Sequence, residues 1–130
     1  MTHPIDARNG RQKIAIAWAC RAFTAKVARN GIERSMRFFE ESAELVQAVG
    51  LTREQCDAIL DRVFARPRGN VEKEIGDAGL TLITLAEAEG FSADECEART
   101  LAHVQSKPDS HWQGRQNAKA EQGLGQKVPA

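Results

Sequence analysis

Aromatic residues are scarce in this sequence and tyrosine is absent: five phenylalanines and two tryptophans make up 5% of the 130 residues. No apolar run approaches the roughly 18 residues of a membrane-spanning helix, so we expect no membrane span. The opening segment Met1–Asp6 lacks the apolar stretch of a signal peptide. The three cysteines, Cys20, Cys56 and Cys96, form no C-x-x-C pair, which favours reduced, buried thiols in a cytoplasmic protein.

Several motifs of familiar enzyme classes are also missing. There is no Walker loop and no G-x-G-x-x-G, so phosphate is not expected to sit in a glycine cradle. No G-x-S-x-G and no cysteine–histidine pairing points to covalent catalysis, and the absence of E-x-x-H argues against a carboxylate-bridged di-iron bundle. With no strand pattern and no internal repeat either, the sequence predicts a helical protein without a nucleotide-binding loop.

Charge of either sign is plentiful but unevenly placed, although the net charge is zero. Residues 1–39 hold eight Lys/Arg against two Asp/Glu, residues 40–105 hold six against fourteen, and residues 106–130 hold four against two. A basic flank beside an acidic middle suits a protein that binds a metal and a polyanion together. It equally suits two regions that attract each other within the fold or between subunits.

Apolar residues recur at three- and four-residue steps, which predicts an all-α fold. Asn30-Gly31, Gly50 and Gly90 are typical helix ends, and capping boxes begin at Thr52 and Ser92. The expected helices span residues 11–29, 32–49, 52–65, 71–88 and 92–105. The helix 52–65 is a short connection, so the core is a four-helix bundle.

The expected domain covers residues 1–107, with its core at about 11–107 and a loose lead-in over residues 1–9. Pro108 begins a different composition, because residues 108–130 hold several glycines and few large apolar residues. We expect an irregular C-terminal tail there. The stripes predicted to face the core are Ile32, Met36, Phe39, Ala43 and Val46 on one helix, and Val71, Ile75, Ala78, Leu82 and Leu85 on another.

Two acidic motifs carry the main functional signal: Glu41-Ser-Ala-Glu44 and Glu74-Ile-Gly-Asp77. Each pair is spaced i, i+3, so both acids project from one helix face, at the edge of the apolar stripe. If the two helices pack together, four carboxylates converge. At an effective dielectric of about 20, two like charges about 4 Å apart repel by about 4 kcal/mol. A divalent cation, Mg²⁺ or Mn²⁺, would turn this repulsion into oxygen coordination.

The competing interpretation is that both pairs lie on ordinary solvated helix faces, where acids three residues apart are common. The position of both pairs at the edge of the apolar stripe, and not opposite it, favours a site. Gly76 and Gly79 each cost about 1 kcal/mol inside a helix. Their expected use is close contact with another helix beside the acidic pair.

The stretches Glu40-Glu41-Ser-Ala-Glu44-Leu45 and Glu72-Lys-Glu74-Ile-Gly-Asp77-Ala-Gly-Leu80 resemble the MazG-like superfamily of all-α nucleoside triphosphate pyrophosphohydrolases. That group has E-x-x-E on one helix and E-x-x-D on a later one. The resemblance covers about residues 32–107. The intervening residues 45–73 are long for the family and contain the extra helix, which leaves the subfamily open.

This resemblance implies hydrolysis of a (d)NTP to the monophosphate and pyrophosphate, with water attacking the α-phosphorus and Mg²⁺ bound by carboxylates. The implied metal ligands are Glu41, Glu44, Glu74 and Asp77. Either Glu40 or Glu44 would orient or deprotonate the water. The family also implies homo-dimers or homo-tetramers with sites near subunit contacts, and the wide apolar stripe that includes Phe38 and Phe39 agrees with association.

Further candidates for contact with the substrate each have an ordinary alternative. Arg37, Lys73, Lys107 and Arg115 are cations suited to phosphates or are plain surface charges. Thr81, one turn after Asp77, would face the nucleotide. Trp18 would stack on a base or fill the core. Trp112 would close over the site, dock on a neighbouring subunit or lie in a disordered tail.

Two other functions remain open. One is a non-catalytic helical interaction module whose acidic face docks a basic partner. The other is a nucleic-acid binder that uses residues 8–37, although the acidic middle and the zero net charge speak against stable nucleic-acid binding.

Overall fold

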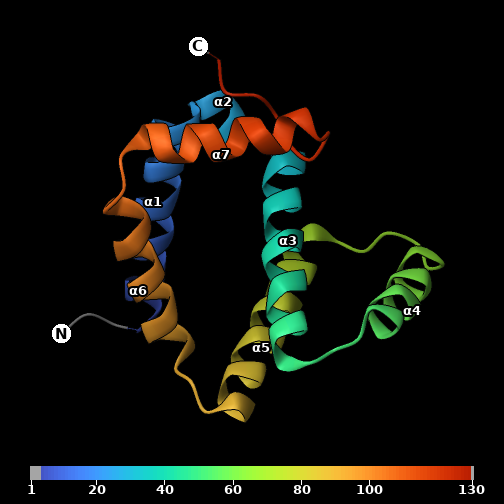
Figure 1. The fold of residues 1–130 in the computed structure, drawn as a ribbon. Coiled ribbons are helices and arrows are strands. Elements are labelled where there is room, and N and C mark those ends of the chain that lie inside the picture. Colours follow the sequence, from blue (N-terminus) through green and yellow to red (C-terminus); the bar gives the residue numbers. More distant parts are fainter. Residues whose placement is uncertain (1–3, 130) are drawn as a thin grey trace. The chain divides into compact units, whose positions relative to one another are not determined.

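The computed structural model describes residues 4–129, with side chains from Ala7 onward, and every regular element in that range is an α-helix (Figure 1). The all-α prediction is therefore confirmed. No helix among these residues is long and apolar enough to cross a membrane. The helices are α1 (Pro4–Phe23), α2 (Ala25–Ala28), α3 (Gly31–Val49), α4 (Arg53–Phe64), α5 (Val71–Glu89), α6 (Ala93–Gln105) and α7 (Asp109–Glu121).

The start and stop signals in the sequence place most helix ends correctly. Gly50 and Gly90 follow α3 and α5 with φ angles of 118° and 83°. Thr52 forms the expected capping box, in which its hydroxyl accepts from the Gln55 amide and the Gln55 side chain accepts from the Thr52 amide. Local hydrogen bonding therefore explains where these helices begin and end.

The N-terminal boundary differs from the prediction. Helix α1 begins at Pro4, so the described part of residues 1–9 is helical rather than a loose lead-in. Proline is favoured in the first turn of a helix, where its missing N–H is not needed. The helix expected over 11–29 is also broken at Thr24, whose φ of 78° separates α1 from α2. Apolar periodicity continues across this break and so did not reveal it.

The C-terminal segment is also different, because the predicted irregular tail is wrong over residues 109–121. These residues form α7, which follows Pro108 and packs against α1 (Figure 1). Helix α7 carries few large apolar residues, so no apolar stripe marked it in the sequence. The segment after residue 107 is therefore part of the fold and not an appendage.

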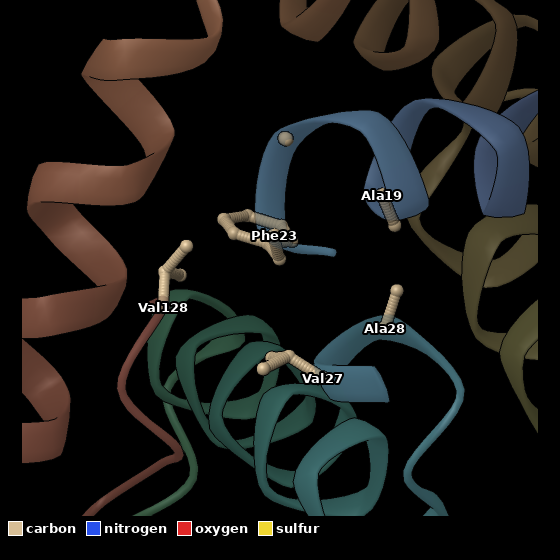
Figure 2. Close-up of a cluster of buried hydrophobic side chains, with 6 residues drawn as sticks. Ala19, Phe23, Val27, Ala28 and Val128 are labelled. Carbon is tan, nitrogen blue, oxygen red and sulfur yellow. The ribbon is translucent and has the colours of Figure 1, made fainter. Parts of the chain in front are cut away.

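The chain divides into two units. The terminal unit comprises Met1–Phe39 and Asp94–Ala130, and the middle unit comprises Glu40–Ala93. In the terminal unit, α1 packs against α2 and α7, and three of the six buried apolar residues are alanines. Figure 2 shows this core, in which Val128 of the C-terminal segment faces Phe23. The buried apolar residues are Ala19, Ala22, Phe23, Val27, Ala28 and Val128.

The middle unit has no buried residue at any position. Of the predicted stripe on α5, Ile75 is 68% exposed and Val71 75% exposed. Among residues 4–129, the helix pairs that pack against each other are α1 with α2 and α1 with α7, all in the terminal unit.

The three cysteines correct another expectation. All are free, but Cys20 and Cys56 are half-buried and Cys96 is exposed, so the prediction of buried thiols is wrong for Cys96. Cys96 lies on α6, whose residues include no buried side chain.

Candidate functional site

The first acidic pair lies on the last part of α3. This helix begins after Asn30, whose side-chain oxygen accepts from the Glu33 amide at 2.9 Å. Glu41 and Glu44 are exposed, and Glu40 is half-buried. The spacing of three residues keeps the carboxylates of Glu41 and Glu44 on one face, as the sequence predicted.

The second pair lies in the first two turns of α5. Asn70 caps this helix by accepting from the Lys73 amide at 3.1 Å. Glu74 and Asp77 are exposed, with 59% and 53% of their side-chain surface accessible. Acids near a helix N-terminus also stabilise the helix through its dipole, which gives Glu74 a purely structural use as well.

Lys73 forms ion pairs with both acids of this second pair. Its Nζ lies 2.7 Å from Asp77 Oδ2 and 4.0 Å from Glu74 Oε1. The hydrogen bond to Asp77, with the charges of both acids, raises the pKa of Lys73 above its ordinary value. Any cation that binds Asp77 must therefore displace or share Lys73, although the pair is exposed and weak.

A single chain does not bring the two pairs together. Among the described residues, no group of three or more His, Cys, Asp or Glu side chains is placed to hold a metal ion. A Cβ added at Gly76 or Gly79 would meet nothing within 4 Å, so the expected close helix contact is also not made within one chain. The oxygen donors suit Mg²⁺ or Mn²⁺ by chemistry, but one copy presents them as two separate exposed pairs.

The remaining candidates fall in different places. Thr81 is exposed on α5 and its hydroxyl donates to the Ala78 carbonyl at 3.0 Å. Lys107 is exposed between α6 and α7. Arg37 belongs to the terminal unit, where its Nε lies 3.4 Å from Glu33 Oε1 and its Nη2 donates to the Leu124 carbonyl. The acids and Thr81 belong to the middle unit.

Both tryptophans lie in the terminal unit and contact each other. The rings of Trp18 and Trp112 meet edge to face with centroids 5.6 Å apart, and the Trp112 indole N–H donates to the Val104 carbonyl at 3.0 Å. Arg115 lies over the Trp112 ring. Trp112 therefore packs against the core of the terminal unit instead of lying in a disordered tail, and base stacking by Trp18 stays a prediction.

A buried charged cluster that was not predicted from the sequence surrounds Glu33, which is 1% exposed. Its Oε1 accepts from Gln116 Nε2 at 2.7 Å and its Oε2 accepts from the Gln126 amide at 2.8 Å. Arg34 approaches the same carboxylate at 3.4 Å. Burial lowers the pKa of Arg34, and the charge of Glu33 opposes that shift. The only local signal was an acid followed by arginines one and four residues later.

The described geometry thus holds a closed polar cluster in the terminal unit and two exposed carboxylate pairs in the middle unit. No family model, curated protein or solved structure matches this chain.

Proposed function

We propose that the protein is a metal-dependent nucleoside triphosphate pyrophosphohydrolase. The observation that carries this proposal is the pair of acidic motifs, Glu41/Glu44 and Glu74/Asp77, each exposed on one helix face and each beside an exposed apolar stripe. Their spacing and flanking residues resemble the MazG-like enzymes, which supplies the reaction class. The donors are hard oxygens, which suit Mg²⁺ or Mn²⁺.

In this proposal the four carboxylates hold the metal, which supplies charge neutralisation at the phosphates and a lower pKa for bound water. Glu40 or Glu44 holds the attacking water and accepts its proton. Water adds to the α-phosphorus, and the bond to the bridging oxygen breaks, so that pyrophosphate leaves and the monophosphate remains. Lys73 and Thr81 lie on α5 with the second acidic pair, where they would contact the substrate.

The proposal includes a second copy of the chain, in a homo-dimer or homo-tetramer. The middle unit leaves its large apolar side chains exposed, including Phe64 at 85%, and such surface favours association. Gly76 and Gly79 are costly in a helix and face open space, which another helix approaching from a second copy would explain. The exposed residues are Leu45, Val49, Ile59, Val63, Phe64, Val71, Ile75, Leu80, Ile83 and Phe91.

The direct test measures pyrophosphate release from a panel of NTPs and dNTPs with Mg²⁺. We expect Glu41→Gln, Glu44→Gln, Glu74→Gln and Asp77→Asn each to lower the rate by more than about 100-fold, since even residues behind metal ligands cost about 10–100-fold. The matched control is Glu87→Gln, which removes an exposed charge ten residues beyond Asp77, about 15 Å along the axis of α5, and should leave the rate unchanged. Equal rates for wild type and all four variants would contradict the proposal.

Association is tested separately by sedimentation of Ile75→Asp. This change places a charge on the exposed apolar stripe of α5 and should shift the protein toward monomer. Thr84→Asp is the control, because Thr84 lies nine residues later, on the opposite face of the same helix. A wild type that sediments as a monomer at all concentrations contradicts the assembly, whatever the acid variants show.

A non-catalytic interaction module is the second candidate, favoured by the separation of the two acidic pairs in one chain. It predicts that Mg²⁺ and Mn²⁺ leave the melting temperature unchanged. Binding to the native state alone would add about 2.7 kcal/mol at a metal concentration of about 100 times Kd. The three free cysteines suit the cytoplasmic setting proposed for either function.

A further inference from the structure

The C-terminal residues fold back onto the terminal unit through a sharp turn after α7. Gly123 has a φ of 74°, which favours glycine, and its amide donates to the Ala120 carbonyl at 3.0 Å. The Leu124 amide donates to the Lys119 carbonyl at 2.9 Å, which completes a Schellman ending. The chain thereby reverses direction, and residues 124–128 return along the terminal unit.

Polar side chains bind the backbone of this returning segment at alternate positions, Leu124, Gln126 and Val128. The Leu124 carbonyl accepts from Arg37 and the Gln126 amide donates to Glu33 at 2.8 Å. The Gln126 carbonyl accepts from Gln116 Nε2 at 2.9 Å. These contacts recognise backbone groups, so they fix the register of the segment without regard to its side chains.

The contacts continue at Val128, whose amide donates to Asn117 Oδ1 at 2.7 Å. Asn117 lies beside Gln116 on α7, so this helix binds the segment at two successive places.

Two positions of the segment are selected by their side chains instead. A Cβ at Gly125 would lie 2.9 Å from Gln116 Nε2 and 3.1 Å from Glu33 Oε2, so a larger residue would push apart the buried polar cluster. Val128 is 5% exposed and joins the apolar core beside Phe23 (Figure 2). Lys127, between them, is exposed.

We infer that the first part of α3 and helix α7 form a peptide-recognition seat, whose ligand is the chain's own segment 124–128, here named the C-terminal clasp. The seat accepts a peptide that has glycine at the second position and a medium-sized apolar residue at the fifth. Its backbone is bound by Glu33, Arg37, Gln116 and Asn117. The side chain at its fifth position is buried in the apolar core. This inference concerns the terminal unit alone and stands apart from the proposed phosphohydrolase function.

The test uses the full chain with Val128→Asp, which places a charge in the core position and should release the clasp. A fluorescent peptide with the sequence of residues 123–129 is the probe, and its anisotropy is measured. We expect the variant to bind it at least about tenfold more tightly than wild type does, because the tethered clasp acts at an effective concentration of about millimolar in the wild-type chain.

Peptide variants decide whether the seat is selective. A probe with leucine in place of Gly125 should bind at least about tenfold more weakly, and a probe with alanine in place of the exposed Lys127 should bind equally well. Equal binding of all three probes, or no binding by a variant that keeps its helical circular dichroism, overturns the inference.

If the variant fails to fold, hydrogen exchange on the wild-type chain provides the answer. The amides of Gln126 and Val128, which the seat binds, should exchange at least about tenfold more slowly than the amide of Lys127. Three amides that exchange at the same rate would also overturn the inference.

Discussion

In the terminal unit an acidic residue, Glu33, is almost fully enclosed, whereas in the middle unit even the phenylalanine at position 64 is exposed. Their charges also differ. The terminal unit holds 13 Lys/Arg against 7 Asp/Glu, and the middle unit holds 5 against 11, which together give the 18 and 18 of the whole chain. In the terminal unit, residues far away in the sequence donate hydrogen bonds to a buried carboxylate. In the middle unit, ordinary apolar stripes are exposed.

An amphipathic pattern shows that a helix needs a packing partner, but it does not show where in the sequence, or in which molecule, that partner lies. For the terminal unit the partner lies in the same chain: Gln116 and Gln126 are 83 and 93 residues from Glu33. For the middle unit no such segment covers the stripes among the described residues, since none of positions 40–93 is buried. The exposed side chains of this unit include Phe64 at 85% and Val71 at 75%.

The largest expected effect concerns the buried Glu33 cluster of the terminal unit. Glu33→Ala leaves Arg34 and Gln116 without their buried acceptor, so the free energy of unfolding should fall by about 3–5 kcal/mol. Urea unfolding followed by circular dichroism measures it. Glu87→Gln, an exposed acid of the middle unit, should change the value by less than about 0.5 kcal/mol. If both substitutions change the free energy of unfolding by less than about 0.5 kcal/mol, the proposed difference between the two units is wrong.

A smaller effect is expected when a valine is replaced by alanine, and its size should differ between the two units. Val128→Ala should cost about 2 kcal/mol, because two buried carbons are lost at about 0.8 kcal/mol each and a cavity remains. Val63→Ala, at an exposed position, should cost less than about 0.5 kcal/mol in dilute protein. Melting at several protein concentrations is the measurement. A cost for Val63→Ala that grows with concentration would show that association covers the middle unit.

The smallest effect concerns the exposed ion pair of α5. Asp77 raises the pKa of Lys73 in the folded state, so this pair contributes stability below the ordinary lysine value of 10.5. That contribution is lost as the pH rises through the higher folded pKa. An NMR titration of Lys73 Nζ should show its pKa falling in Asp77→Asn. Saturating Mg²⁺ should also lower it in wild type if Asp77 binds the metal, and an unchanged pKa speaks against that ligand.

Local signals in the sequence predicted much of the fold. Thr52 with Gln55 and the glycines at 50 and 90 mark helix ends through contacts within a few residues, and the structure confirms them. Helix α7 was not predicted, because its polar sequence has no apolar periodicity and its position depends on packing against α1. The helix break at Thr24 was not predicted, because the apolar periodicity is the same in α1 and α2 on either side of it.

The candidate site could be predicted only as separate pieces. The spacing of Glu41 with Glu44 and of Glu74 with Asp77 places each pair on one helix face, and that much follows from helix geometry alone. Whether the two pairs meet depends on contacts between helices, which spacing does not encode. The Glu33 cluster lay beyond prediction for the same reason, since its partners come from the other end of the chain.

The contact between Trp18 and Trp112 has a practical consequence for every unfolding experiment. These are the two tryptophans of a chain without tyrosine, and both belong to the terminal unit. Intrinsic ultraviolet emission therefore reports that unit alone, whereas the far-ultraviolet helix signal reports both. Two melting curves recorded on one sample would separate if the units lose structure independently, and they would superimpose if the chain melts as one cooperative body.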